Sequence, residues 1–123
     1  MILADTSIWI DHIRAPQPVL AHLLNDGKII MHPIIVGELS LGSLPNRTEF
    51  LATLHDMPMA TAATDEEIRY FIENAKLYSR GVGYMDVSLL TAVRLTPNAR
   101  IWTRDKRLRQ IASELSLDAV LSH

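Results

Sequence analysis

The chain has 123 residues, a formal net charge of −2 and no cysteine. This length predicts a single domain over residues 1–123, and the lack of cysteine excludes a disulfide framework and a thiolate metal site. Neither a run of about 18 apolar residues nor a basic segment ahead of an apolar stretch occurs, so we expect no membrane span, no signal peptide and a cytoplasmic protein.

Short apolar runs are spaced along the chain. The first is Ile2–Ala4, and similar runs lie at residues 28–31 and 99–103. Runs this short, without polar alternation, are typical of buried parallel strands. Residues 117–121 predict a further strand, and residues 57–60 predict an edge strand or a loop because they contain a proline.

The segments between these runs carry helix patterns and helix-end signals, such as the capping box formed by Thr64 and Glu67. Strands that alternate with helices predict an α/β fold. We expect a central parallel β-sheet of four to five short strands, flanked by helices on both faces. The predicted helices are residues 6–15, 18–25, 33–41, 47–55, 65–80, 85–95 and 105–115.

Four of the fourteen acidic residues lie where a solvated acid is not expected. Asp5 and Asp105 follow predicted strands, and ligands of open α/β sheets bind at the carboxyl ends of strands. Glu38 and Asp86 share helical spacing with apolar residues, which predicts that both face inward. The other acids, Asp11 among them, fit turns, helix starts or solvated helix faces.

Simpler explanations exist for each acid taken alone. Asp5, Asp86 and Asp105 are suitable helix N-caps, and Glu38 can reach the rim of a site or pair with an arginine. Taken together, converging carboxylates repel one another unless cations lie between them. An all-oxygen site suits Mg²⁺ or Mn²⁺, and such a site next to the basic strip around Asp105 is suited to phosphodiester hydrolysis.

Four segments in a fixed order are together specific to one family: MILADTSIWIDH, VGELSLG, GVGYMDVSLLTA and WTRDKRL. With them the chain resembles the PIN-domain ribonucleases, and in particular the VapC-type toxins of type II toxin–antitoxin systems. The resemblance spans essentially the whole chain. It implies a PIN-like fold and a metal-dependent endoribonuclease that hydrolyses RNA phosphodiester bonds.

The resemblance also implies the roles of the four acids. Asp5, Asp86 and Asp105 are expected to hold Mg²⁺ directly or through water, and Mn²⁺ is a possible substitute. Glu38 is expected to complete the catalytic site and to orient the attacking water.

The residues after the last clear strand are expected to support this site. Thr103 matches a hydroxyl residue of the family and is expected to bond a ligand carboxylate or water. Many relatives have a further acid or Asn where Lys106 and Arg107 stand here, so one tightly held ion is expected. Arg104, Lys106 and Arg107 are predicted to contact RNA phosphates, which positions the RNA without reading its sequence.

The resemblance further implies three partners: RNA, a second copy of the chain in a homodimer, and a cognate antitoxin. The antitoxin is expected to cover apolar helices between residues 6 and 55 and to place a basic side chain among the acids. Two other classes stay open. A receiver-type signalling domain has paired acids after its first strand, where Thr6 and Ser7 stand here. A non-catalytic module would use the acidic pocket only to bind a basic partner.

Overall fold

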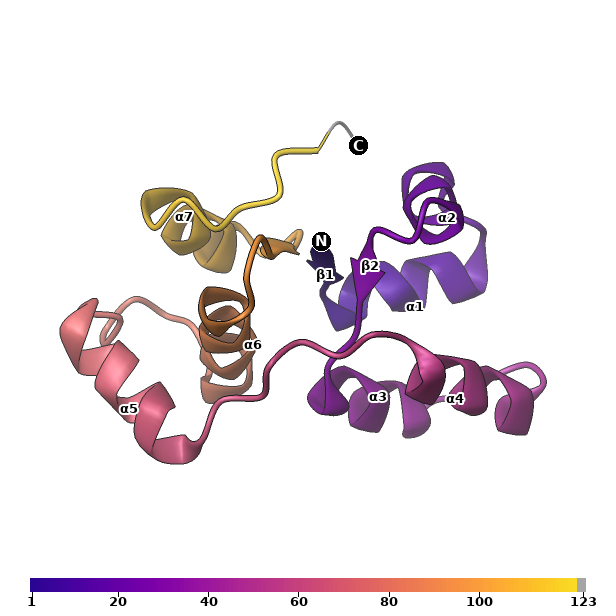
Figure 1. Cartoon of the computed structure of the whole chain (residues 1–123), viewed down its shortest axis with the longest axis horizontal. Coiled ribbons are helices and arrows are strands. Elements are labelled where there is room, and N and C mark those ends of the chain that lie inside the picture. The colour runs from indigo at the N-terminus through magenta and orange to yellow at the C-terminus, as the bar shows by residue number, and fades with distance from the viewer. Residues whose placement is uncertain (122–123) are drawn as a thin grey trace.

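The computed structural model describes residues 1–121 (Figure 1). Three short strands are separated by helices along the chain. The strands are β1 (Ile2–Ala4), β2 (Ile29–Ile30) and β3 (Arg100–Trp102). The helices are α1 (Thr6–Arg14), α2 (Pro18–Asn25), α3 (Pro33–Ser40), α4 (Arg47–Asp56), α5 (Asp65–Asn74), α6 (Tyr84–Leu95) and α7 (Lys106–Glu114).

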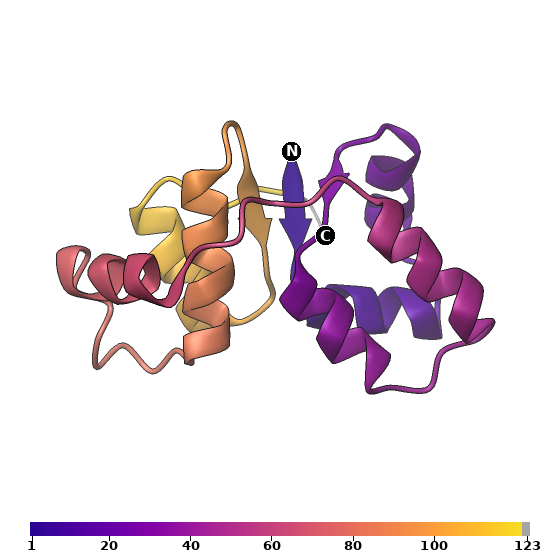
Figure 2. The same ribbon diagram turned by 60° about the horizontal axis from the view of Figure 1, so that its bottom comes forward.

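The three strands form one parallel sheet in the order β2-β1-β3. Leu3 of the central strand pairs with Ile30 on one side and with Ile101 on the other. Helices α1 to α4 lie on the β2 side of β1, and α5 to α7 lie on the β3 side (Figure 2). Because the strands are parallel, their carboxyl ends meet at one edge of the sheet, between these two groups of helices.

The predicted α/β class is confirmed, but the sheet has three strands rather than four to five. Residues 57–60 and 117–121 each contribute only an isolated parallel bridge, Met31 to Met59 and Ile101 to Asp118. In the first case Pro58 has no N–H with which to extend the pairing. In the second, the bridge consists of the two backbone hydrogen bonds around Ile101 and goes no further.

The core surrounds β1 and α6. Every residue of α6 from Val87 to Val93 is buried, and both tryptophans, Trp9 and Trp102, are buried as core residues. Burial of apolar side chains such as these is the main contribution to the stability of a domain of this size. No helix within residues 1–121 is both long and apolar enough to cross a membrane.

Helix α5 ends earlier than predicted. The capping box of Thr64 and Glu67 starts it as expected, but the helix stops at Asn74 instead of continuing toward Gly81. The cause is a Schellman motif with Lys76 in the left-handed conformation at φ 55°. Its two bonds run from Leu77 N–H to the Ile72 carbonyl and from Lys76 N–H to the Glu73 carbonyl.

Candidate active site

Asp5 lies directly after β1 and provides the N-cap residue of α1. Its backbone carbonyl accepts from the Ile8 N–H at 3.1 Å, but its side chain makes no capping hydrogen bond. The carboxylate instead accepts a hydrogen bond from the Thr103 hydroxyl, with 2.7 Å between Oγ1 and Oδ2. Asp5 is therefore not a side-chain cap, and its carboxylate faces the end of β3.

Thr103 joins the acids of two strands. Its buried hydroxyl donates to Asp5 and accepts from the Asp105 backbone N–H at 3.1 Å. The hydroxyl–carboxylate bond expected from the sequence is thus present. A hydroxyl has one proton to donate and lone pairs to accept, so both bonds can form together.

Asp86 occupies the first turn of α6, where its half-buried carboxylate accepts a hydrogen bond from the Gly83 backbone. Burial raises the pKa of Asp86 above its ordinary value, and the charges of Asp5, Asp105 and Glu38 raise it further. Each of the other three acids is thus near enough to act on Asp86. The structure therefore places the other three acids singled out in the sequence within electrostatic reach of Asp86.

Glu38 is exposed, so the prediction that it faces inward is wrong. The buried stripe of α3 consists of Ile35, Val36 and Leu39, and Glu38 lies at its edge. Its apolar neighbour Leu41 is 89% exposed and does not mark a core-facing side. Glu38 still belongs to the site because its Oε1 accepts a 2.7 Å hydrogen bond from the Thr6 hydroxyl at the start of α1.

Asp105 is both an N-cap and a member of the site. Its Oδ1 accepts from the backbone N–H groups of Arg107 at 2.9 Å and Leu108 at 3.0 Å, which caps α7. Both capping bonds end on Oδ1, so Oδ2 is not used by the cap. The capping and ligand interpretations of this residue are therefore compatible.

The four acids share one kind of donor, the carboxylate oxygen, which is the ligand preferred by Mg²⁺ and Mn²⁺. Burial and the charges of the other three acids raise the pKa of Asp86, and a cation among the carboxylates would relieve the repulsion between them. Within residues 1–121, no three His, Asp or Glu side chains lie close enough together to hold a metal ion as they stand. The donor chemistry fits a hard divalent ion, and ligation would require the side chains to close around it.

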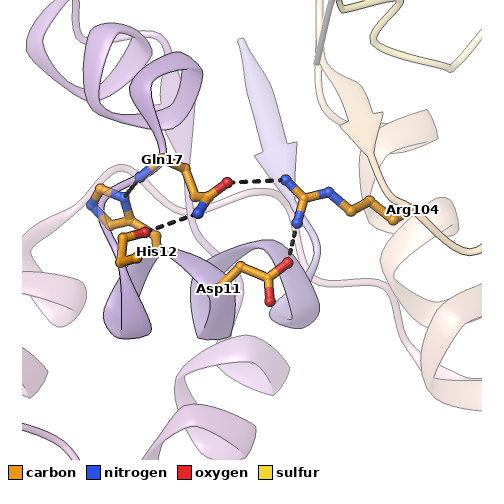
Figure 3. A network of polar contacts seen from close by, with 5 residues as sticks. Asp11, His12, Gln17 and Arg104 are labelled. Carbon is orange, nitrogen blue, oxygen red and sulfur yellow. Dashed lines mark hydrogen bonds and ion pairs between the residues drawn. The ribbon is translucent and has the colours of Figure 1, made fainter.

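The basic residues after β3 differ in their surroundings. Arg104 forms an ion pair with Asp11 of α1 and also reaches Gln17 (Figure 3). The Arg107 guanidinium donates to the Gly81 carbonyl at 3.4 Å. Lys106, at the start of α7, is exposed. Contact of these three side chains with RNA phosphates stays a prediction.

A pocket of about 330 Å³ lies beside Glu38, between α1, α3 and the loop that follows α3. Its walls are mainly aliphatic and are open to solvent at Ile10, which is 38% exposed. The lining residues are Ile10, Ile13, Arg14, Glu38, Leu39, Gly42, Ser43 and Leu44.

Two residues of the site region were missed by the sequence analysis. The sequence predicts no partner for Thr6, and it predicts only a solvated helix position for Asp11. Their partners lie 32 and 93 positions away, at Glu38 and Arg104. No local pattern signals a pairing over such separations.

The chain is 40% identical over 114 residues to Ribonuclease VapC32 of Mycobacterium tuberculosis strain CDC 1551 / Oshkosh. It is equally similar to Ribonuclease VapC32 of strain ATCC 25618 / H37Rv. In both cases the match covers 93% of this chain and 92% of the relative. No protein-family model matches the chain. The likeness therefore concerns the whole domain and not a single motif.

Proposed function

The chain belongs to the VapC ribonuclease family, and from this we propose that it is a metal-dependent endoribonuclease and the toxin of a toxin–antitoxin pair. The observation that carries the proposal is that the charges of Asp5, Glu38 and Asp105 all act on Asp86, while Thr103 and Thr6 hold Asp5 and Glu38 by hydrogen bonds. Family membership gives the receiver-type alternative no support, and the name ribonuclease favours a catalytic over a purely binding role.

In the proposed mechanism, Asp5, Asp86 and Asp105 would hold one Mg²⁺ or Mn²⁺ ion. Such an ion would supply stabilisation of negative charge on the phosphate and a lowered pKa of water. Thr103 holds the Asp5 carboxylate in one orientation, and Thr6 does the same for Glu38. Glu38 would orient the attacking water. As the water oxygen bonds to phosphorus, the bond between phosphorus and the leaving oxygen of the RNA breaks. The water loses a proton to solvent, and the leaving oxygen takes one up from solvent.

Lys106 and Arg107 lie in the first turn of α7, next to Asp105. We infer that they receive phosphates beside the cleaved bond, because both are exposed cations at the rim of the acidic site. This role positions the RNA backbone and carries no base preference.

Chelation is expected to abolish cleavage reversibly. Purified protein should cut RNA in Mg²⁺ or Mn²⁺, lose the activity in excess EDTA, and regain it when either ion is restored, because the carboxylates alone repel the phosphate. Gel analysis of a labelled RNA measures the cut. A cleavage rate that EDTA leaves unchanged would contradict the metal-dependent mechanism.

We further propose that the pocket beside Glu38 receives an apolar side chain of the antitoxin. Two observations support this: the pocket is walled by Ile10, Ile13, Leu39 and Leu44, and it opens next to one of the four acids. A partner anchored there can extend a basic side chain toward the carboxylates, which attract a cation when no metal is bound. The homodimer implied by the resemblance stays a prediction.

Ile10→Lys is expected to weaken antitoxin binding without reducing RNA cleavage. A lysine at this wall removes the apolar contact that the antitoxin side chain would make in the pocket. Loss of such a buried contact costs about 2 kcal/mol or more of binding free energy, which is about thirtyfold in affinity. Titration calorimetry with the antitoxin encoded beside this chain measures the effect. Val120→Lys, a change at a residue that does not line this pocket, is the control. Equal affinities of the two variants would exclude the pocket.

A further inference from the structure

The carboxylate site is assembled from two sides of the molecule. Asp5 and Glu38 are held by hydroxyl groups at the end of β3 and the start of α1. Asp86 and Asp105 belong to the starts of α6 and α7. Helices α1 and α3 lie on the opposite side of β1 from α6 and α7 (Figure 2). The spacing of the four acids therefore depends on how firmly the segment after β3 is fixed against α1.

One ion pair crosses this boundary. The other ion pairs found in residues 1–121 stay on one side of β1, as in Arg80 with Glu114 and Arg109 with Asp118. Arg104, between β3 and α7, instead pairs with Asp11 of α1. Its position in the chain places it directly between Thr103 and Asp105, two residues of the site.

The guanidinium of Arg104 is held at two points (Figure 3). Nη1 pairs with the Asp11 carboxylate, and Nη2 lies 3.5 Å from Oε1 of Gln17. Gln17 is itself fixed, because its backbone N–H donates to Nδ1 of His12 at 2.9 Å and its side-chain amide donates to the Ala15 carbonyl at 2.8 Å. Arg104 thus ties the end of β3 to the last turns of α1 and to the chain leaving it.

We propose that Arg104 is a positioning residue whose pair with Asp11 sets the spacing between the Asp5 and Asp105 carboxylates, and thereby the affinity of the site for its divalent ion. The inference rests on the proposed function. In this role the guanidinium acts on the site through α1 and not through the RNA.

The solvent exposure of the Arg104–Asp11 pair suggests that it affects the nearby site more than the stability of the whole fold. The Arg104 and Asp11 side chains are 34% and 40% exposed, and ion pairs this open to solvent add little to the stability of the whole fold. Metal affinity is more sensitive, because a constellation of ligands must be held to within about 0.5 Å. A change at this pair should therefore alter ion binding more than melting temperature.

Charge exchange tests the proposal. Arg104→Asp and Asp11→Arg are each expected to weaken Mn²⁺ binding about tenfold or more, the range found when residues that orient metal ligands are lost. The double variant, which restores the pair in reverse, should recover most of the affinity. Calorimetric titration with Mn²⁺ in the absence of RNA gives this result independently of catalysis, and kcat should fall with the affinity while KM for RNA stays nearly constant.

Milder variants keep the test decisive if an exchanged chain misfolds. Asp11→Asn and Arg104→Lys remove or weaken the pair at nearly constant volume, and the first should reduce Mn²⁺ affinity more than the second. Arg80→Gln is the matched control, since its pair with Glu114 is similarly exposed at 33% and 47% but stays on the β3 side. It should leave Mn²⁺ affinity unchanged.

The opposite result is equally clear. If Arg104 only contacts RNA, Asp11→Asn leaves both Mn²⁺ affinity and kcat intact, and the Arg104 variants raise only KM for RNA. The double variant with exchanged charges then recovers no Mn²⁺ affinity. These results would overturn the positioning role. Failure of the wild-type chain to bind Mn²⁺ and to cut RNA would overturn the proposed function as well.

Discussion

Replacing Asp86 with asparagine is expected to abolish RNA cleavage and, at the same time, to raise the melting temperature of the metal-free protein. Catalysis should fall about 10³-fold, because the variant loses a proposed metal ligand and the charge stabilisation that a bound ion would supply is worth several kcal/mol. The stability gain has a different origin. Burial and the charges of Asp5, Asp105 and Glu38 all disfavour the ionised form of Asp86 in the folded state.

The pH dependence follows from the sign of this shift. A carboxyl whose pKa is raised on folding binds more protons in the folded than in the unfolded state, so stability falls as the pH rises from its ordinary pKa to the raised one. The amide that replaces the carboxyl in Asp86→Asn does not ionise, so the variant escapes this loss. Its advantage in EDTA should therefore be present at neutral pH and shrink as the pH drops toward the ordinary carboxyl range.

Glu66→Gln is the matched control for Asp86→Asn, since Glu66 is an exposed acid in the first turn of another helix, α5. It should keep full activity and gain no stability, because acids favour helix N-termini. Scanning calorimetry and an RNA cleavage assay on the same samples measure both quantities. Wild-type cleavage by Asp86→Asn would remove the residue from the site, and an unchanged melting temperature would contradict the repulsion inferred among the acids.

Thr103→Val is expected to reduce Mn²⁺ affinity and kcat about 10- to 100-fold, the usual effect of removing a partner that orients a metal ligand. Valine fills the buried volume of threonine but cannot donate to Asp5 or accept from the Asp105 N–H. The variant should also lose about 1–3 kcal/mol of unfolding free energy if these groups stay unpaired. Ion titration and urea unfolding distinguish the two effects.

Thr103→Ser serves as the control for that substitution because it retains the hydroxyl. It should keep most of the metal affinity while losing one buried methyl group. If the serine and valine variants bound Mn²⁺ equally weakly, the cause would be packing around β3 and not the bond to Asp5.

Local signals explain which elements were predicted well. Helix α2 matches its predicted bounds, since a proline at its start and an Asp-Gly turn at its end are readable in the sequence. Helix α5 was predicted too long because the stop signal sought was a glycine, whereas Lys76 takes the left-handed conformation. The strand count was too high because residues 57–60 and 117–121 pair through one residue each, which depends on tertiary contacts.

In the site, too, features with a local sequence signal were predicted and features that depend on tertiary contacts were not. Asp5 and Asp105 were located by the ends of predicted strands, and Asp86 by its helical spacing with apolar residues, and both signals are local. The exposed position of Glu38 was missed because the apolar run of α3 continues to Leu41, beyond the residues that reach the core. The pairs that hold the site together join distant segments, so only the folded chain reveals them.

The central place of β1 has a consequence for synthesis. Strand β1 pairs along one side with β3, which comes last of the three strands in the sequence. The hydrogen bond between Asp5 and Thr103 joins residues 98 positions apart. Contacts of such long range form slowly, because the entropy of closing the loop opposes them. Because Asp86 and Asp105 also come late in the sequence, long after Asp5 and Glu38, the four acids can lie together only once the segment that contains Asp105 has been made.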